Sequence, residues 1–199
     1  MQHRSQEERS RGTRTVLEQA GRKLFAENGF TAVSAEQIVI AAGVTRGALN
    51  YHYGDKRGLF LAVLEQLEVE NTEEIEAAIA AAPAPDDLLA TMSIGLGVFL
   101  KICQRPEMVR IALSDAPAVL GWQAWREFEA RHGLGLIVAL LENARAAGLI
   151  VDAPVSMLAQ LLLSAVTEAG LIVAHEPDPH VARIDAQRAL MALIAGLLR

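Results

Sequence analysis

Residues 34–56 read SAEQIVIAAGVTRGALNYHYGDK, and this stretch decides the fold of the N-terminal part of the chain. Ser34, followed three residues later by Gln37, is the pattern of a capping box, which opens a helix. Gly43 ends that helix after about eight residues, because glycine adopts the positive φ that a helix end favours. Thr45 then caps a second short helix. Two short helices joined by a tight turn predict a helix-turn-helix.

The segment that precedes this motif also has helical spacing. Its apolar residues fall on one face between about residues 13 and 28, and Gly29 follows as a helix-ending residue. The residues of that face are Val16, Leu17, Ala20, Leu24 and Phe25. We therefore predict a three-helix domain over residues 1–55, with residues 1–12 as a flexible arm.

Longer helices are expected after residue 55. The predicted segments are 56–79, 86–104, 107–114 and 121–147, followed by two apolar helices near the C-terminus. Alternating runs of β-branched and aromatic residues, which favour strands, do not occur. The sequence predicts an all-α chain, with a helical C-terminal domain over residues 56–199.

Charge is divided unevenly between the two predicted domains. Residues 1–60 hold nine Lys and Arg against six Asp and Glu, whereas residues 61–199 hold nine against eighteen, so the net charge of −6 divides into +3 and −9. A basic N-terminal part on an acidic chain is compatible with a nucleic-acid-binding domain. Charge runs on solvated helix faces offer an equally simple explanation.

Other functional classes receive little support from the sequence. The longest stretch without an acidic or basic residue, Ala153–Thr167, has fifteen residues and falls short of a membrane span. The N-terminus has no signal-peptide pattern, so a cytoplasmic protein without membrane association is expected. Cys103 is the only cysteine, which excludes an internal disulfide. His175, Glu176, Asp178 and His180 have metal-ligating chemistry, but a solvated connector between helices has the same composition, and no metal site, cofactor or enzymatic activity is predicted.

The segment from Thr13 to Leu64 resembles the DNA-binding domain of the TetR family of bacterial transcriptional regulators. The most specific stretch is AGVTRGAL at residues 42–49, followed by YHYGDK at residues 51–56 and by Leu59 and Phe60. Phe25, Gly29, Phe30 and Ile38 also occupy positions that the family pattern expects. The resemblance covers about a quarter of the chain.

This resemblance implies that the third helix lies in the major groove of double-stranded DNA. Carried over position by position, the residues facing DNA are Thr45, Arg46, Gly47, Asn50, Tyr51 and His52. Ser34 and Lys56, each at the start of a helix, are expected to contact phosphates.

Three positions depart from the common family pattern. Asn50 replaces a frequent tyrosine, and its amide could pair with adenine or bond a phosphate or water. Val39 replaces a smaller alanine where two helices cross. Tyr53 stands where phenylalanine is usual, and a packing role is the favoured interpretation.

In the TetR family, a cavity among the middle helices binds a small molecule that releases the protein from DNA. The resemblance therefore implies a mostly apolar effector. The candidate lining residues are Met92, Phe99, Cys103, Met108, Trp122, Trp125 and Phe128. Ordinary core packing is the alternative for each of them.

The family also dimerises through its last two long helices, and both of these are apolar on more than one side here. The expected homodimer interface comprises Leu158, Leu162, Ala165, Ala169, Ile172, Leu190, Leu193 and Leu197. We predict a ligand-responsive repressor with a palindromic operator. The alternative is a helical dimeric ligand- or partner-binding protein with a vestigial DNA-binding domain.

Overall fold

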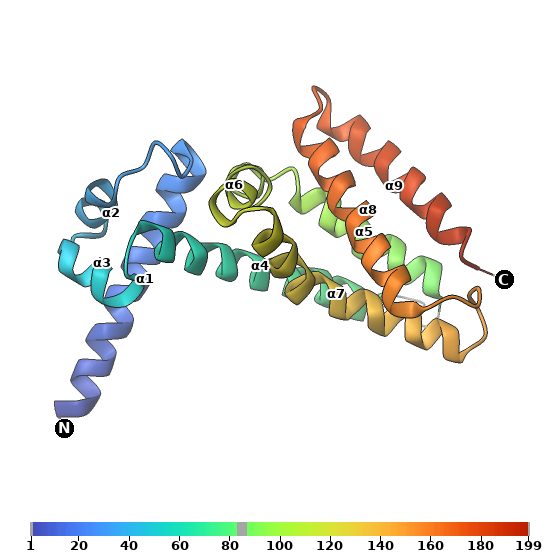
Figure 1. Cartoon of the computed structure of the whole chain (residues 1–199), viewed down its shortest axis with the longest axis horizontal. Helices are drawn as coiled ribbons and strands as arrows, with labels where there is room; N and C mark the ends of the chain where they lie inside the picture. The colour runs from blue at the N-terminus through green and yellow to red at the C-terminus, as the bar shows by residue number, and fades with distance from the viewer. Residues whose placement is uncertain (1, 83–86, 199) are drawn as a thin grey trace. The chain divides into compact units, whose positions relative to one another are not determined.

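The computed structural model describes residues 2–82 and 87–198, which confirm the predicted all-α class (Figure 1). The elements are α1 (Gln2–Asn28), α2 (Ala35–Ala42), α3 (Arg46–Tyr53), α4 (Lys56–Ala80), α5 (Leu88–Ile102), the π-helix η1 (Met108–Asp115), α6 (Ala116–Leu120), α7 (Trp122–Ala146), α8 (Val155–His175) and α9 (Pro179–Ala195). One isolated bridge between Ile150 and Leu198 is the only extended pairing among these described residues.

Helix α1 begins earlier than the sequence pattern indicates. We expected a flexible arm over residues 1–12, but the structure is helical from Gln2 onward. Glu, Gln and Arg in this segment are good helix formers, and no proline interrupts them. The hydroxyl of Thr13 also donates to the carbonyl of Arg9, 3.0 Å away, within the same helix. Apolar periodicity did not indicate this continuation because residues 2–12 include no large apolar residue.

The described chain packs as two compact units. Unit 1 comprises residues 1–67 and 106–119, and unit 2 comprises residues 68–105 and 120–199. Helix α4 contributes residues to both units. The predicted division of the chain at residue 55 differs from this grouping, because residues 106–119 belong with the N-terminal helices.

The core of unit 1 holds α2 and α3 against α1. Leu17, Ile38 and Leu49 are fully buried, one from each of these three helices. The rings of Phe25 and Phe60 meet edge to face with their centroids 5.2 Å apart. This packing fixes α3 with one apolar side inward and the opposite side outward.

The segment Pro106–Val119, which contains η1 and α6, completes unit 1. Arg22 donates two hydrogen bonds to the carboxylate of Glu107, at 2.8 and 2.9 Å. The carboxylate of Asp115 accepts from the backbone N–H of Phe30 at 2.6 Å. The sequence correctly predicted a helix near residues 107–114 but assigned it to the C-terminal domain.

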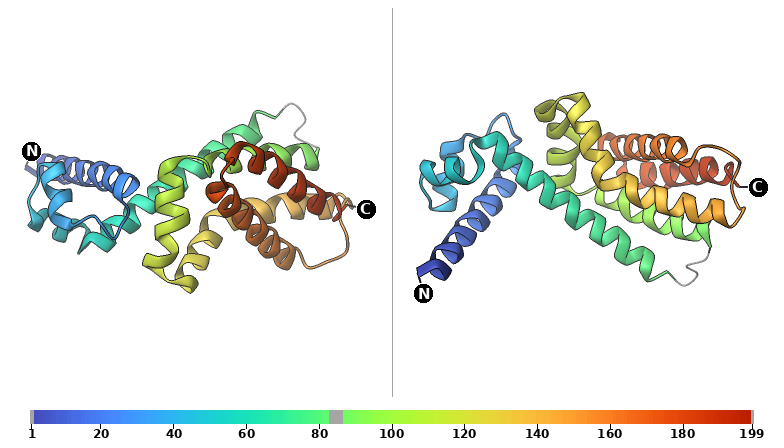
Figure 2. Two further views of the ribbon diagram at one scale, coloured as in Figure 1. Left: turned by 90° about the horizontal axis from the view of Figure 1, so that it is seen from above. Right: turned by 60° about the horizontal axis from the view of Figure 1, so that its bottom comes forward.

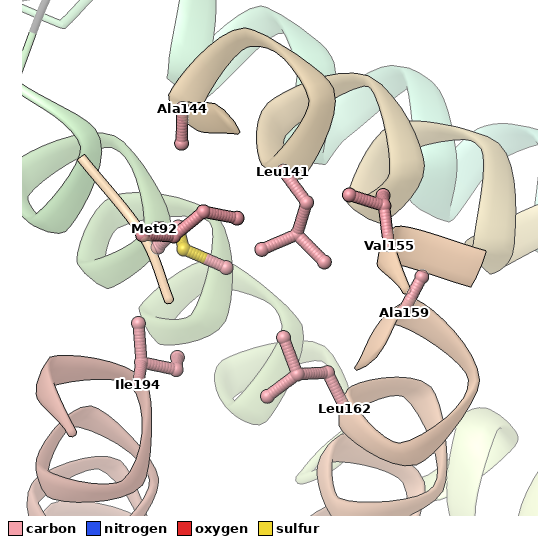
Figure 3. Packing of buried hydrophobic residues seen from close by; sticks show 8 residues of the cluster. Met92, Leu141, Ala144, Val155, Ala159, Leu162 and Ile194 are labelled. Carbon is pink, nitrogen blue, oxygen red and sulfur yellow. The ribbon is translucent and has the colours of Figure 1, made fainter. Parts of the chain in front are cut away.

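Unit 2 has its own apolar core among α5, α7, α8 and α9. Figure 3 shows Met92, Leu141, Leu162 and Ile194 converging from these four helices, each at most 8% exposed. Such a close-packed interior fixes the relative register of the helices.

Helix α8 is long and apolar enough to span a membrane by length and hydropathy alone. Within unit 2, however, it packs against α5, α7 and α9, and Thr167, Ala169 and Val173 are buried there. We attribute its apolar composition to these helix–helix contacts, because a core helix needs the same composition.

Candidate DNA-binding surface and effector cavity

The turn between α2 and α3 forms as the sequence predicts. The hydroxyl of Ser34 accepts from the N–H of Gln37, and the Gln37 side chain accepts from the N–H of Ser34, which completes the capping box. Gly43 ends α2 with a φ of 66°. The N–H of Val44 then donates to the carbonyl of Val39 at 3.0 Å, which is the bond pattern of a tight helix C-terminus.

Helix α3 presents a polar face to solvent. The hydroxyl of Thr45 caps the helix by accepting from the N–H of Ala48, and Leu49 anchors the inner side at 0% exposure. The outer side exposes Thr45, Arg46, Gly47, Asn50 and Tyr51, the last to 83%. His52 is half-buried, and its ring meets that of Tyr51 edge to face. The structure thus gathers the expected base-reading residues on one exposed face.

Lys56 has a structural role that the sequence did not indicate. Its ammonium donates to the carbonyls of Phe30 and Val33, both at 2.7 Å, and lies 4.0 Å from the centre of the Phe30 ring. Desolvation lowers the pKa of Lys56, and the carboxylate of Asp115 opposes that shift. Lys56 therefore fastens the segment between α1 and α2, and its phosphate contact stays a prediction. Ser34, the other expected phosphate contact, is exposed.

Tyr53 bonds within unit 1. Its hydroxyl donates to the carboxylate of Glu18 at 2.7 Å. Burial, together with that hydrogen bond, raises the pKa of Tyr53 to about 12. The geometry agrees with the packing interpretation, because the polar end of the ring is directed to α1.

Unit 2 contains a cavity of about 140 Å³ between α4, α5, α7, α8 and α9. Its wall is mainly leucine, isoleucine and valine. The polar side chains in the wall are those of Thr72, His132 and Thr167. Gly95 and Gly133 also form part of the wall. A Cβ atom added at Gly95 would lie 3.0 Å from Ile79, and one added at Gly133 would lie 2.9 Å from Leu163. The arrangement is suited to an apolar molecule with a small number of hydrogen-bonding groups.

Only part of the expected effector lining surrounds this cavity. Met92 and Phe99 belong to the wall, whereas the other five candidates do not. Those five are Cys103, Met108, Trp122, Trp125 and Phe128. The expectation relied on large and adaptable side chains, but the actual wall consists mostly of ordinary aliphatic residues.

The five residues outside the cavity wall have other environments. Met108 belongs to unit 1, and Trp122 is 70% exposed. Cys103, Trp125 and Phe128 are buried, and burial raises the pKa of the Cys103 thiol to about 12. The sequence offered no clear signal for the wall of this cavity, because Gly97 and Gly135 lie in the same helices as Gly95 and Gly133 and are outside the wall.

Helices α8 and α9 lie side by side in both views of Figure 2, and an apolar groove runs between them. Of the expected dimer residues, Ile172 and Leu193 are 47% and 62% exposed and line this groove. Leu162, Ala169 and Leu190 are buried, and Leu158, Ala165 and Leu197 are half-buried. Further exposed apolar side chains on the two helices are Met157, Leu161, Val181 and Ile184.

The connector between α8 and α9 matches the simpler interpretation of its composition. Asp178 caps α9 by accepting from the N–H groups of His180 and Val181. His175 bonds the carbonyl of Leu171 in the preceding turn. Over residues 2–82 and 87–198, no three His, Cys, Asp or Glu side chains gather as metal ligands would.

Two family profiles match this chain, one over the N-terminal part and one over the C-terminal part. The profile described as "Bacterial regulatory proteins, tetR family" matches residues 18–63, which contain α2, α3 and the start of α4. The profile described as "Tetracyclin repressor-like, C-terminal domain" matches residues 89–197, more than half of the chain. The chain belongs to the TetR family. Its predicted family and fold are thereby confirmed.

Individual TetR-family proteins are similar to this chain over different shares of their length. A TetR-family transcriptional regulator from Pectobacterium atrosepticum has a TM-score of 0.81 and 31% identity, with 96% of each chain covered. The regulator AcrR from Shigella flexneri is 36% identical over 73 residues, which are 37% of this chain and 34% of AcrR. The chain thus matches this curated relative over about a third of its length. The complex of SmeT with triclosan has a TM-score of 0.68 at 23% identity, with 94% and 92% covered.

Membership in the TetR family agrees with a DNA-binding transcriptional regulator and not with an enzyme, since the named relatives are transcriptional regulators. The exposed face of α3 lies within the matched DNA-binding segment, and the cavity and the α8–α9 groove lie within unit 2. The role of each residue in these three places stays a prediction.

Proposed function

We propose that this protein is a cytoplasmic, homodimeric transcriptional repressor that leaves its operator when a small molecule fills the cavity of unit 2. The exposed polar face of α3 carries this proposal. A helix fixed by Leu49 on one side and exposing Arg46, Asn50 and Tyr51 on the other is shaped to read base edges.

Each residue of that face has a proposed role. Thr45, Arg46, Asn50, Tyr51 and His52 contact bases or nearby phosphates, and Gly47 lets the backbone approach the duplex. Asn50 has the donor and acceptor needed for a paired contact with adenine. Ser34 contacts a phosphate at the start of α2, where backbone N–H groups also favour an anion.

A second copy of the chain is the proposed occupant of the α8–α9 groove. The groove exposes Ile172 and Leu193, and these apolar side chains lie among acidic groups such as Glu168 and Asp185. A two-fold dimer presents two copies of α3, so its operator should be a near-palindrome. Its half-sites should be about one helical turn apart, roughly 34–36 Å, or a multiple of that spacing.

Effector response requires unequal binding to two states of the protein. An effector lowers operator affinity only to the extent that it binds the DNA-incompetent state more tightly. By the same linkage, operator DNA must weaken effector binding by the same factor. The fold accommodates small molecules in at least one solved structure, since SmeT was determined as a complex with triclosan.

The test is selection of bound sequences from a random duplex library at physiological salt. A palindromic consensus is the expected result. Asn50→Ala should then relax the preference at one position of each half-site, whereas Lys23→Ala, an exposed cation of α1, should leave the consensus unchanged. Binding without any enriched sequence, and with strong salt dependence, would contradict the proposal and favour a vestigial DNA-binding domain.

A further inference from the structure

We infer that the cavity of unit 2 selects an uncharged molecule of about the size of a substituted benzene, which places one hydroxyl group at the His132 and Thr167 end. This inference rests on the proposed function and specifies the chemistry of the effector.

The size of the cavity suits a compact molecule. Its volume is about 140 Å³. An apolar cavity of roughly 150 Å³ in a protein holds one benzene molecule. A single six-membered ring with one or two small substituents therefore fits without movement of the helices.

The wall of the cavity disfavours a charged ligand. Its described residues include no Asp, Glu, Lys or Arg. A charge that enters such a site loses its hydration and gains no counter-charge, which costs several kcal/mol. Thr167 of the wall is hydrogen-bonded to the carboxylate of Glu129. Arg126 also bonds that carboxylate, at 3.1 Å.

The same surroundings disfavour an anion in particular. Desolvation raises the pKa of Glu129, despite its hydrogen bond from Thr167 and its contact with Arg126. Negative charge is thus already expensive at this end of unit 2, and a second carboxylate would add repulsion.

Helix register places His132 and Thr167 of the wall near one another. A Cβ atom added at Gly133 would lie 2.9 Å from the Leu163 side chain, and Thr167 is hydrogen-bonded to Glu129. These two pairs show that α7 and α8 run antiparallel, which brings His132 next to the turn of α8 that contains Thr167. On α5, a Cβ atom added at Gly95 would lie 3.0 Å from the Ile79 side chain of α4.

Phe99 marks the same polar end from α5. Its ring is 3.1 Å from the Cβ position of Gly170, one turn beyond Thr167. Ile79, Met92, Leu140 and Ile194 form the other, wholly apolar end of the wall. The cavity is therefore amphipathic along its length.

The hydrogen-bonding pattern at the polar end favours a hydroxyl. The Thr167 hydroxyl gives its hydrogen to Glu129, so its oxygen can act toward the cavity as an acceptor. The His132 imidazole offers a donor or an acceptor, according to its tautomer. A hydroxyl can donate to Thr167 and accept from His132 at the same time. A ketone or an ether, which only accepts, cannot satisfy Thr167.

Four probes of matched shape test this inference by calorimetric titration of the full-length protein at neutral pH. The probes are benzyl alcohol, toluene, benzoate and benzylamine. We expect benzyl alcohol to bind about five-fold more tightly than toluene, the gain of one net hydrogen bond. We expect it to bind at least about ten-fold more tightly than either charged probe, because an unpaired buried charge is costly.

Variants locate the preference. His132→Phe and Thr167→Val should each remove the advantage of benzyl alcohol over toluene without weakening toluene itself. Ser156→Ala, on an exposed position of α8, is the matched control and should change no affinity. Leu136→Phe fills the cavity and should weaken all four probes, and Ile137→Phe serves the same purpose if that variant does not fold.

Several results would overturn the inference. They are benzoate or benzylamine binding as tightly as benzyl alcohol, toluene binding equally well, an unchanged preference in His132→Phe, or no binding by any probe up to its solubility. The proposed function is judged separately, from operator release. If benzyl alcohol is preferred but no cavity ligand lowers operator affinity, the proposed function fails and the inference stands. If benzoate binds the cavity more tightly than benzyl alcohol and releases the operator, the inference fails and the proposed function stands.

Discussion

Lys56 has an observed structural role and a predicted phosphate contact. Its ammonium bonds the carbonyls of Phe30 and Val33, and an ammonium has a third N–H for a phosphate. We expect Lys56→Met, which keeps the aliphatic stem, to lower the free energy of unfolding by about 1–3 kcal/mol, because two carbonyls lose their donor. Urea unfolding of the variant measures this change.

The salt dependence of operator binding tests the predicted phosphate contact of Lys56 apart from its structural role. Loss of a phosphate contact should reduce the salt slope by about one, whereas a purely structural loss weakens binding without changing the slope. Lys23→Met removes an exposed positive charge from α1 and is the control for stability. An equal loss of stability in both variants would show that the two carbonyl bonds of Lys56 contribute nothing.

Tyr53 gives the protein a stability term that depends on alkaline pH. Its pKa is raised to about 12 in the folded protein from 10.0 in the unfolded chain, chiefly by burial. The folded state thus keeps a proton that the unfolded state releases. Stability from Tyr53 is fully present below pH 10 and is lost as the pH rises from 10 to 12.

Tyr53→Phe should therefore be less stable than the natural protein near pH 9, and this difference should diminish between pH 10 and 12. Thermal unfolding over that range provides the measurement. Tyr51→Phe is the matched control, because the Tyr51 side chain is 83% exposed. A constant difference for Tyr53→Phe would rule out the buried hydroxyl as its origin.

At the residue scale, the sequence predicted exposure and capping better than it predicted the cavity. Ser34, Gly43 and Thr45 follow local rules that involve only neighbouring residues, so their roles are visible in the sequence. Trp122 and Phe128 could not be placed in the same way. Whether a large apolar residue faces a cavity, a core or solvent depends on helix register, which distant contacts set.

Among the elements, η1 is held to α1 by specific polar contacts. Arg22 and Glu107 form a two-bond pair whose side chains are only 24% and 31% exposed. A double-mutant cycle with Arg22→Met and Glu107→Gln should give a coupling energy of about 0.5–2 kcal/mol, because the pair is bidentate and partly buried. Hydrogen exchange of the α1 amides reports the local opening that this pair opposes.

An exposed pair elsewhere provides the comparison. Arg188 and Asp185 lie 3.7 Å apart on α9, with 80% and 66% of their side chains exposed. The same type of cycle there, read from the α9 amides, should give a coupling near zero, since exposed pairs contribute little. Equal coupling energies in the two cycles would mean that the Arg22–Glu107 pair is an ordinary surface contact.

The existence and order of the elements were largely predictable, because their apolar spacing and their stop signals are local. The helix ends near Asn28, Ala42 and Tyr53 follow from glycines and caps. The assignment of η1 was not predictable. The contact of this segment with α1 includes pairs such as Arg22 with Glu107, which are 85 positions apart in sequence and leave no periodic signal.

For the whole molecule, the proposed dimer through the α8–α9 groove would determine how many copies of α3 reach the operator. We expect the double variant Ile172→Asp and Leu193→Asp to be a monomer of 21.4 kDa, because both exposed apolar side chains line the groove. Light scattering after size-exclusion chromatography measures its mass. Operator affinity should fall by about 10²–10⁴-fold, the loss expected when two linked sites act singly.

Leu149→Asp is the control for this experiment. Leu149 is 45% exposed but belongs to the turn after α7, outside the groove. It should leave both mass and operator affinity unchanged. A dimeric mass for the double variant would place the interface on another surface of the molecule.

The membership of residues 106–119 in unit 1 limits how new regulators can arise from this one by recombination. A single crossover at residue 55 would pair α1, α2 and α3 with a foreign η1, so Arg22 and Phe30 would lose Glu107 and Asp115. A functional chimera needs the middle segment to travel with the N-terminal helices, although more than thirty residues of another unit lie between them. Unit 1 of this protein is thus encoded by two separate segments of one gene.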